Sequence, residues 1–278
     1  MTTSIDPARL VFVGGLHRSG TTPFARLLAE HPDVSGLART GVREDEGQHL
    51  QGVYPKAKVF GGSGRFARDP RAHLTEDSPL LTPEAPQAML DAWLPYWDDG
   101  ARLLLEKSPP NILMGRFLQA AYPGSALIIV VRHPVAVALS TKKWRRFSSG
   151  DPRRFESLSR LVEHWILAHD ILAEDLERLP RAMVVHYETL VHAPGPELER
   201  VRSHLGLDPA HPLQPLSRDH GSEYELWWEE LRSSLRPGGW QRRLIERRYG
   251  DRIAQFGYDV TDLSAQRAVA ADPHLLRA

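Results

Sequence analysis

GGLHRSGTT, the stretch Gly14–Thr22, sets the architecture that the rest of this chain has to satisfy. It follows the apolar run LVFV of residues 10–13 and precedes the helix-like run FARLLAEH. A buried strand, a glycine-rich turn and a helix N-terminus together form an anion-binding site, because backbone N–H groups converge there and the helix dipole adds positive potential. Gly15 and Gly20 have the spacing of a nucleotide-phosphate loop, whereas Thr21 stands where such a loop carries lysine. The alternative is a plain glycine turn beside an exposed arginine.

The composition is that of an ordinary globular chain. Its 278 residues suffice for a sizeable core; 41% are hydrophobic, 25% are charged, and the formal net charge is zero. A zero net charge provides no global basic field for nucleic acid. Cysteine is absent, which excludes disulfides and thiolate sites, and the thirteen histidines form no HExxH motif. No apolar run approaches the ~20 residues of a membrane span. We expect a cytoplasmic protein with no membrane span, no metal site and no nucleic-acid partner; its oligomeric state stays open.

Strands and helices alternate along the chain. Apolar runs predict strands, and amphipathic runs with capping residues predict helices. Thr21 or Thr22 is expected to cap the first helix, and Asn111 a later one. Residues 31–82 are interpreted as a long functional loop with short helical pieces near residues 44–50. Predicted strands cover residues 10–13, 103–106, 126–131 and 182–187, and predicted helices cover 20–30, 87–97, 111–121, 134–143, 155–179, 196–205 and 240–256.

This alternation predicts a P-loop-like, three-layer α/β fold, with a mostly parallel central sheet and helices on both faces. A single domain is expected over residues 1–278, with its core at about 9–260 and a weakly patterned tail at 261–278. Ligands of such sheets bind beyond the carboxyl ends of the strands. The segments expected at that edge are 14–22, 106–108, 132–140 and Tyr187.

Both parts of the metal–triphosphate machinery of NTP-hydrolysing loops are missing. Such loops use a lysine for the β- and γ-phosphates and a carboxylate from a second strand for Mg²⁺. Here the lysine is absent, and the strand at 126–131 ends in Arg132-His133-Pro134 instead of an aspartate. We infer a smaller anion, such as a 5′-phosphate with one further group, neutralised by Arg18 and nearby hydroxyls. A nucleotide or small-molecule kinase and a non-catalytic nucleotide-binding module are the alternatives.

RHPVAVALS, the stretch Arg132–Ser140, has the same organisation as the first motif. Arg132 ends a buried strand, and Ser140 lies about two helical turns further on, on nearly the same helix face. Arginine offers a fork of donors that matches phosphate oxygens, and the hydroxyl adds another donor. The segment predicts a second phosphate-sized anion site; a surface arginine and a small packed serine are the alternative.

Taken together, these two segments resemble the PAPS-dependent sulfotransferases, where PAPS is 3′-phosphoadenosine 5′-phosphosulfate. The resemblance is closest to the tyrosylprotein and bacterial small-molecule branch, in which RSGTT and HPDV occur in this order. Two further matches are VVHYETLV at 184–191 and WQRRLIERRYGDRIAQFGY at 240–258. The resemblance covers about residues 9–260. It implies transfer of a sulfuryl group from PAPS to the hydroxyl of an alcohol or phenol, without a metal.

The resemblance also implies roles for individual residues. The first loop would hold the 5′-phosphosulfate, and the second arginine and serine would hold the 3′-phosphate. Tyr187 would lie near the adenine, and Arg236, in SSLRPGGW before the last helix, would add a contact. The implied cofactor-binding residues are Arg18, Ser19, Gly20, Thr21, Thr22, Arg132, Ser140, Tyr187 and Arg236.

We look for the general base in TGVREDEGQHLQ, residues 40–51, because the acceptor hydroxyl has to lose a proton. Its three adjacent carboxylates repel one another, so a buried one would have a raised pKa. The resembling branch has its glutamate in a Glu-Glu-Thr-Arg segment shortly after HPDV, whereas nine other residues intervene here. We rank Glu46 first and Glu44 second, with Asp45 and His49 open; a solvated acidic turn is the alternative.

Charge that develops on the leaving phosphate oxygen needs a cation, and Lys107 is the first choice. It follows LLLE and precedes Ser-Pro-Pro at the carboxyl end of a strand, and it resembles a Lys-Ser-Pro segment of the family. Arg18 and His17 are alternatives for the same task. The acceptor is expected to be a small molecule in a pocket lined by aromatic side chains. The candidates for that lining are Trp93, Tyr96, Trp97, Trp144, Trp227 and Trp228.

Overall fold

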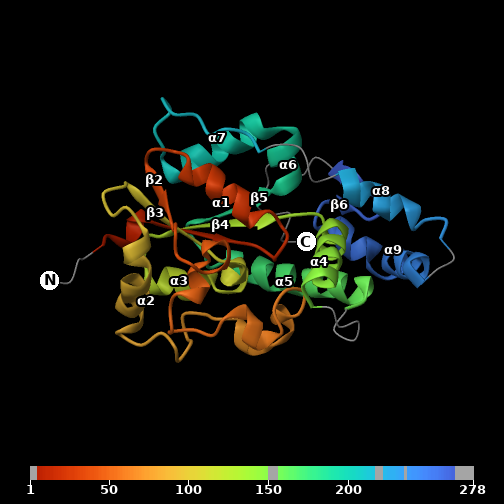
Figure 1. Cartoon of the computed structure of the whole chain (residues 1–278), viewed down its shortest axis with the longest axis horizontal. Helices are drawn as coiled ribbons and strands as arrows, with labels where there is room; N and C mark the ends of the chain where they lie inside the picture. Colours follow the sequence, from red (N-terminus) through yellow and green to blue (C-terminus); the bar gives the residue numbers. More distant parts are fainter. Residues whose placement is uncertain (1–4, 150–155, 217–221, 235–236, 267–278) are drawn as a thin grey trace.

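The computed structural model describes residues 5–149, 156–216, 222–234 and 237–266. At its centre lies a sheet of five parallel strands in the order β2-β3-β1-β4-β5 (Figure 1). Strand β1 is central because Val11 pairs with Leu105 on one side and with Ala126 on the other. The predicted parallel sheet is therefore confirmed. Its strands are β1 (Leu10–Gly14), β2 (Val34–Gly36), β3 (Leu103–Lys107), β4 (Ala126–Val131) and β5 (Ala182–His186).

Helices cover both faces of this sheet, which confirms the three-layer arrangement (Figure 1). Alternate residues of β1 face opposite sides, so Val11 and Val13 pack into one core while Leu10 and Phe12 pack into the other. The first face carries α1 (Thr21–Ala29), α6 (Tyr187–His192) and α7 (Pro194–Leu205), and the second carries α2 (Ala85–Trp93), α3 (Gly115–Ala121), α5 (Leu158–Leu176) and α9 (Pro237–Gln255). Helix α4 (Pro134–Ser149) contacts α5 and also α8 (Ser222–Glu230).

The region predicted as a long loop, residues 31–82, contains one strand. Strand β2 pairs in parallel with the start of β3, with Val34 beside Leu103. The prediction missed it because three residues are too few to show a period of two. Short helical pieces occur near residues 44–50 as predicted. The 3-10 helices are η1 (Pro7–Arg9), η2 (Arg43–Asp45), η3 (Gly47–His49), η4 (Ala57–Phe60), η5 (Phe66–Arg68), η6 (Pro70–Ala72), η7 (Leu94–Tyr96) and η8 (Pro109–Leu113).

Two capping predictions were wrong. Helix α1 begins after Gly20, which has φ 96°, and neither Thr21 nor Thr22 occupies the cap position. Asn111 lies inside η8 instead of at a helix start, and its amide donates to the main-chain oxygen of Val13 at 3.1 Å. Four further helices or strands were not predicted, and the last of them occupies the start of the expected tail. They are α6, α8 and the antiparallel pair β6 (Tyr258–Asp259) and β7 (Asp262–Gln266).

The carboxyl ends of the strands meet at one edge of the sheet, as parallel pairing requires. Val13 at the end of β1 pairs with Lys107 of β3 and with Ile128 of β4. Strand β4 leads into Arg132, and β5 leads directly into Tyr187 at the start of α6. All the chemistry-bearing segments predicted for this edge therefore lie along it.

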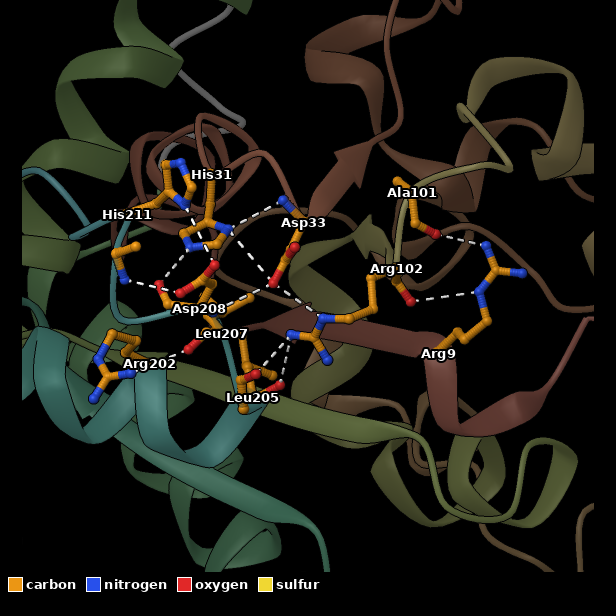
Figure 2. A network of polar contacts seen from close by, with 12 residues as sticks. Arg9, His31, Asp33, Ala101, Arg102, Arg202, Leu205, Leu207, Asp208 and His211 are labelled. Atoms are coloured by element: carbon orange, nitrogen blue, oxygen red, sulfur yellow. Dashed lines mark hydrogen bonds and ion pairs between the residues drawn. The ribbon is translucent and has the colours of Figure 1, made fainter.

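The HPDV segment lies at the opposite edge, between the end of α1 and the start of β2, and Figure 2 shows its polar contacts. The N–H of Asp33 donates to Nδ1 of His31 at 3.1 Å. Oδ2 of Asp33 accepts hydrogen bonds from Nε of Arg102 at 3.0 Å and from the N–H of Asp208 at 3.3 Å (Figure 2). Arg102 precedes β3 and Asp208 follows α7, so HPDV joins three elements far along the chain from one another. Its role here is structural.

Candidate active site

The loop between β1 and α1 packs directly against the neighbouring strands. A Cβ at Gly15 would lie 2.4 Å from the main-chain oxygen of Val130, and a Cβ at Gly20 would lie 2.4 Å from the ring of Tyr187. Arg18 has φ 76°, in the left-handed region that few non-glycine residues adopt. The close contacts explain both glycines, and they fix the ring of Tyr187 against the loop.

Two buried polar atoms of this loop have no hydrogen-bond partner among the described residues. They are Oγ of Ser19 and Nδ1 of His17. Since buried polar atoms are normally hydrogen-bonded, their presence in an anion-binding type of loop indicates groups that await a ligand. Burial lowers the pKa of His17 to about 4, so its ring is neutral near pH 7. Thr21 is buried in the first turn of α1, and Thr22 is half-buried beside it.

The two predicted anion-binding segments meet in space. Nε of Arg18 donates to Oγ of Ser140 at 3.1 Å, and Nη1 of Arg132 donates to the main-chain oxygen of Arg18 at 3.3 Å. The guanidinium of Arg132 also lies over the ring of Tyr187, 4.4 Å from its centroid. Arg18, Arg132, Ser140, Tyr187 and the loop glycines thus form one contiguous site.

A residue of α8 completes this part of the site. The hydroxyl of Tyr224 donates to Oγ of Ser140 at 3.1 Å, and its ring centroid lies 5.5 Å from the guanidinium carbon of Arg132. Sequence reasoning missed Tyr224 because nothing in its local pattern distinguishes it from a core aromatic residue. Arg236, the other contact expected from this part of the chain, lies outside the described residues.

Glu188 stabilises the turn that contains Arg132 and His133. Its Oε1 accepts a hydrogen bond from the N–H of His133 at 2.8 Å, and its Oε2 accepts one from the hydroxyl of Tyr258 at 3.2 Å. Burial raises the pKa of Glu188, while the bond from His133 acts to lower it. The main-chain oxygen of Arg132 accepts a further bond from the indole of Trp165 at 2.9 Å. The turn after β4 is therefore held from both sides, and sequence analysis missed this support although Glu188 stood within a quoted motif.

Lys107 and Glu46 lie together, buried, at the end of β3. Nζ of Lys107 is 3.4 Å from Oε1 of Glu46 and donates to the main-chain oxygen of Glu44 at 2.9 Å. The amide of Gln48 donates to Oε2 of Glu46 at 2.6 Å. The first-ranked base and the first-ranked cation of the sequence analysis are thus in direct contact.

The electrostatics keep Glu46 ionised. Burial acts to raise its pKa, but the hydrogen bond with His49, the charge of Lys107 and the bond from Gln48 together lower it to about 2. Nε2 of His49 lies 3.5 Å from Oε2 of Glu46. A carboxylate with so low a pKa is a weak base while the groups that lower its pKa stay in place.

The other two carboxylates of the segment point away from this pair. Glu44 is exposed, and its Oε2 lies 3.5 Å from Nη2 of Arg26 on α1. Oδ1 of Asp45 accepts bonds from the N–H and the hydroxyl of Thr40, at 3.0 and 2.6 Å. Both residues have positive φ, 53° and 48°, which turns consecutive side chains in different directions. Of the three adjacent carboxylates, the geometry singles out Glu46.

Glu106 is a second buried carboxyl group near Glu46, which sequence analysis placed at the functional edge without assigning it a role. Glu106 is the last residue of the run LLLE, and a charged residue at the end of an apolar strand is the sequence feature that could have identified it. Burial raises its pKa to about 7, although hydrogen bonds from Ser108 and Asn111 and the charge of Lys107 act to lower it.

The aromatic residues expected around the acceptor divide into two groups. Trp93, Trp97 and Trp228 are buried in the core, so packing accounts for their positions and their part in an acceptor pocket stays a prediction. Trp144 of α4 is half-buried, and its ring centroid lies 4.5 Å from the guanidinium carbon of Arg43, in the segment that carries Glu46. Tyr96 and Trp227 are half-buried.

The described residues contain neither a candidate metal site nor a helix that could span a membrane. Over residues 5–149, 156–216, 222–234 and 237–266, no three His, Asp or Glu side chains are grouped so that they could hold a metal ion. In the same part of the chain, no helix combines the length and the apolar character that crossing a bilayer requires.

Comparison with known proteins points to one family. The model of the Sulfotransferase family matches residues 10–211. Nodulation protein NoeE from Sinorhizobium fredii (strain NBRC 101917 / NGR234) is 28% identical over 239 residues, which cover 76% of this chain and 53% of NoeE. Protein-tyrosine sulfotransferase 2 from Gallus gallus is 25% identical over 241 residues, which cover 86% of this chain and 58% of that protein. This chain therefore spans a little more than half the length of these two relatives.

A solved structure agrees at the level of the fold. Sulfotransferase STF1 from Mycobacterium tuberculosis H37Rv superposes with a TM-score of 0.50 at 16% sequence identity. The superposition covers 72% of this chain and 68% of STF1. At this identity the similarity bears on the architecture of the sheet and its helices alone.

Proposed function

We propose that this chain, which belongs to the sulfotransferase family, transfers the sulfuryl group of PAPS to the hydroxyl group of a small alcohol or phenol. Membership of the family follows from the match over residues 10–211. The donor, the acceptor and the residues that act on them are proposals, argued from the geometry of the site.

One observation carries the choice of donor. Nε of Arg18 and Oγ of Ser140 are 3.1 Å apart, so the phosphate loop and the second motif lie in direct contact. A nucleotide with anionic groups at both its 5′ and 3′ positions would use the loop for one group and Arg132 for the other, so both segments would contribute to its affinity. The absence of a loop lysine and of an aspartate after β4 argues against a metal-bound triphosphate there.

The residues present fit such a donor. The unpartnered Oγ of Ser19, the start of α1 and Arg18 would hold the 5′-phosphosulfate together with Thr21 and Thr22. Arg132 and Ser140 would hold the 3′-phosphate. The ring of Tyr187, already packed on Gly20 and Arg132, would lie against the adenine.

Glu46 is the general base and Lys107 the cation in this proposal. The donor supplies an electrophilic sulfur: a bond from the acceptor oxygen to sulfur forms as the bond from sulfur to the bridging oxygen breaks, with the electron pair leaving on the phosphate and the hydroxyl proton passing to Glu46. Lys107 neutralises charge on the departing oxygen. Since Lys107 is one cause of the low pKa of Glu46, turning its ammonium toward the donor would raise the basicity of Glu46 when it is needed.

Titration calorimetry tests the donor assignment. We expect 3′,5′-ADP to bind at least tenfold more tightly than 5′-AMP or ATP, because only 3′,5′-ADP engages both segments. Arg132→Ala should weaken binding of the 3′-phosphate. Arg71→Ala, which removes an exposed arginine paired with Asp69, is its matched control. Equal affinity for ATP and 3′,5′-ADP would contradict the proposal.

A screen of alcohols and phenols with radiolabelled PAPS tests the activity itself. Transfer of label to at least one acceptor is expected, and it should disappear in Glu46→Gln. Transfer that requires Mg-ATP instead would favour the kinase alternative. The cytoplasmic location and the single domain over residues 1–278 stay predictions.

A further inference from the structure

Glu106 is buried more deeply than either residue assigned to the chemistry. Its exposed fraction is 1%, and it stands in β3 directly opposite Phe12 of β1. A carboxyl group in such a place costs free energy unless hydrogen bonds satisfy it. Three donors do so: the hydroxyl of Ser108 at 2.5 Å, the N–H of Gly47 at 3.0 Å and the amide of Asn111 at 2.6 Å.

Two of these contacts reach the chain directly after Glu46. Oε1 of Glu106 accepts from the N–H of Gly47, and Oγ of Ser108 accepts from the N–H of Gln48 at 2.9 Å. The indole of Trp93 donates to the main-chain oxygen of Gly47 at 3.1 Å. Both peptide groups that follow Glu46 are therefore anchored to β3 and α2.

The packing around Gly47 leaves no room for a side chain. A Cβ at Gly47 would lie 2.6 Å from both Cγ and Oε1 of Glu106, and 2.8 Å from the indole nitrogen of Trp93. The side chain of Gln48, whose own N–H is fixed through Ser108, in turn donates to Oε2 of Glu46. The carboxylate of Glu46 is thus placed through the two residues that follow it, Gly47 and Gln48.

We infer that Glu106 is a positioning residue for the proton-transfer step: it holds the Gly47–Gln48 backbone so that the carboxylate of Glu46 stays beside Lys107 at the transfer point. Glu106 itself touches neither of these side chains through a hydrogen bond and needs no contact with substrate. This inference rests on the proposed function, because it assigns a role within the proposed reaction. A purely structural role for Glu106 would lower stability without a specific effect on the chemical step.

The test compares Glu106→Gln with Gly47→Ala in the full chain. Glu106→Gln weakens the three hydrogen bonds that the carboxylate of Glu106 accepts. Gly47→Ala leaves this carboxylate intact, but the added Cβ forces Gly47 and Glu106 apart. We expect kcat to fall about 100-fold in each, the effect of roughly 1 Å of misplacement. The dissociation constant for 3′,5′-ADP should change less than about threefold, because the nucleotide site lies on other segments.

The pH profile provides a readout that a structural role would not move. If the backbone after Glu46 loosens, Glu46 loses part of the contact with Lys107, His49 and Gln48 that lowers its pKa to about 2, so its pKa moves back toward 4.5. The acid limb of kcat/KM should therefore shift upward in both variants by as much as about two pH units.

Asp175→Asn is the matched control. Asp175 is a buried carboxylate of α5, bonded by His73 at 2.9 Å and by Arg116 at 3.3 Å, away from the candidate site. This variant should lose stability while keeping kcat and the acid limb.

The inference is overturned if Glu106→Gln and Gly47→Ala also keep kcat within about threefold, or if they lose affinity for 3′,5′-ADP as much as kcat. If Glu106→Gln does not fold, Gly47→Ala and Ser108→Ala decide by the same criteria. Absence of transfer by the unsubstituted protein would instead refute the proposed function.

Discussion

Nζ of Lys107 lies 3.4 Å from Oε1 of Glu46, and both side chains are buried at the carboxyl end of β3. The structure thus brings the proposed proton acceptor and the proposed cation into direct contact at one site. Each residue also compensates the other's charge. Replacing either one should therefore affect the chemistry and the local electrostatics together.

Glu46→Gln should reduce kcat by 10²- to 10⁴-fold, the usual contribution of a general base, while the dissociation constant of 3′,5′-ADP changes little. Steady-state kinetics with labelled PAPS and calorimetry measure the two quantities. Glu44→Gln is the control, since the carboxylate of Glu44 points toward Arg26. Equal losses in the two variants would show that the base has been assigned to the wrong residue.

Lys107→Met should lower kcat by at least 100-fold, because the departing oxygen loses its cation. The pKa of Glu46 should also rise, since Lys107 is one of the groups that lower it. An upward shift of the acid limb in the residual activity would report this. If Lys107→Met keeps full activity, the cation is Arg18 or His17 instead of Lys107.

Arg132→Lys should weaken binding of 3′,5′-ADP by about 10- to 100-fold and leave 5′-AMP almost unaffected. Lysine keeps the charge but loses the planar fork and the stacking on Tyr187, which lies 4.4 Å away. Calorimetry with both nucleotides gives the ratio. If both nucleotides lose affinity equally, Arg132 does not recognise the 3′-phosphate.

Gly20→Ala should destabilise the protein by roughly 1–3 kcal/mol and weaken nucleotide binding. The new Cβ would meet the ring of Tyr187 at 2.4 Å, and the φ of 96° disfavours any side chain. Tyr187→Leu in the same background should recover part of the stability by removing the clash. Thermal unfolding of the two single variants and the double variant measures this, and strict additivity would contradict the contact.

Stability should fall as the pH drops from 6.5 toward 4. Burial is the main cause that lowers the pKa of four histidines, to about 4 for three and about 3 for the fourth, so the folded state resists protons that the unfolded chain binds. Glu106 and Glu188 act in the opposite direction, since burial raises the pKa of each and so favours the folded state at lower pH, but they are two groups against four histidines. Melting temperatures that stay constant between pH 7 and 4.5 would contradict this expectation. The histidines are His17, His133, His169 and His186.

Much of the fold was predictable because its signals are local. Apolar runs such as 126–131 marked the long strands, and the residues that follow them marked the functional edge. Strand β2 was missed because Val34–Gly36 takes its structure from pairing with β3, not from its own pattern. The cap at Gly20 was missed because the requirement for glycine there comes from Tyr187, far along the chain.

The segments that form the candidate site were predictable, but the residues that hold those segments in place were not. The segments with Arg18 and Arg132 could be paired from the sequence, yet the choice of Glu46 over Glu44 depends on a left-handed turn that no pattern shows. Glu106 and Glu188 act through main-chain groups of residues distant in sequence, Gly47 and His133. Such contacts become visible only once the chain is folded.

The contact between Arg18 and Ser140 has a consequence for the heat of binding. The hydroxyl of Ser140 already engages Arg18 and Tyr224, and Arg132 already engages the main chain of Arg18. An incoming phosphate exchanges these bonds for new ones instead of adding to them, so the measured enthalpy should be smaller than the number of contacts in a complex would suggest. A larger share of the affinity should then come from the release of ordered water and ions, and it should decline as salt concentration rises.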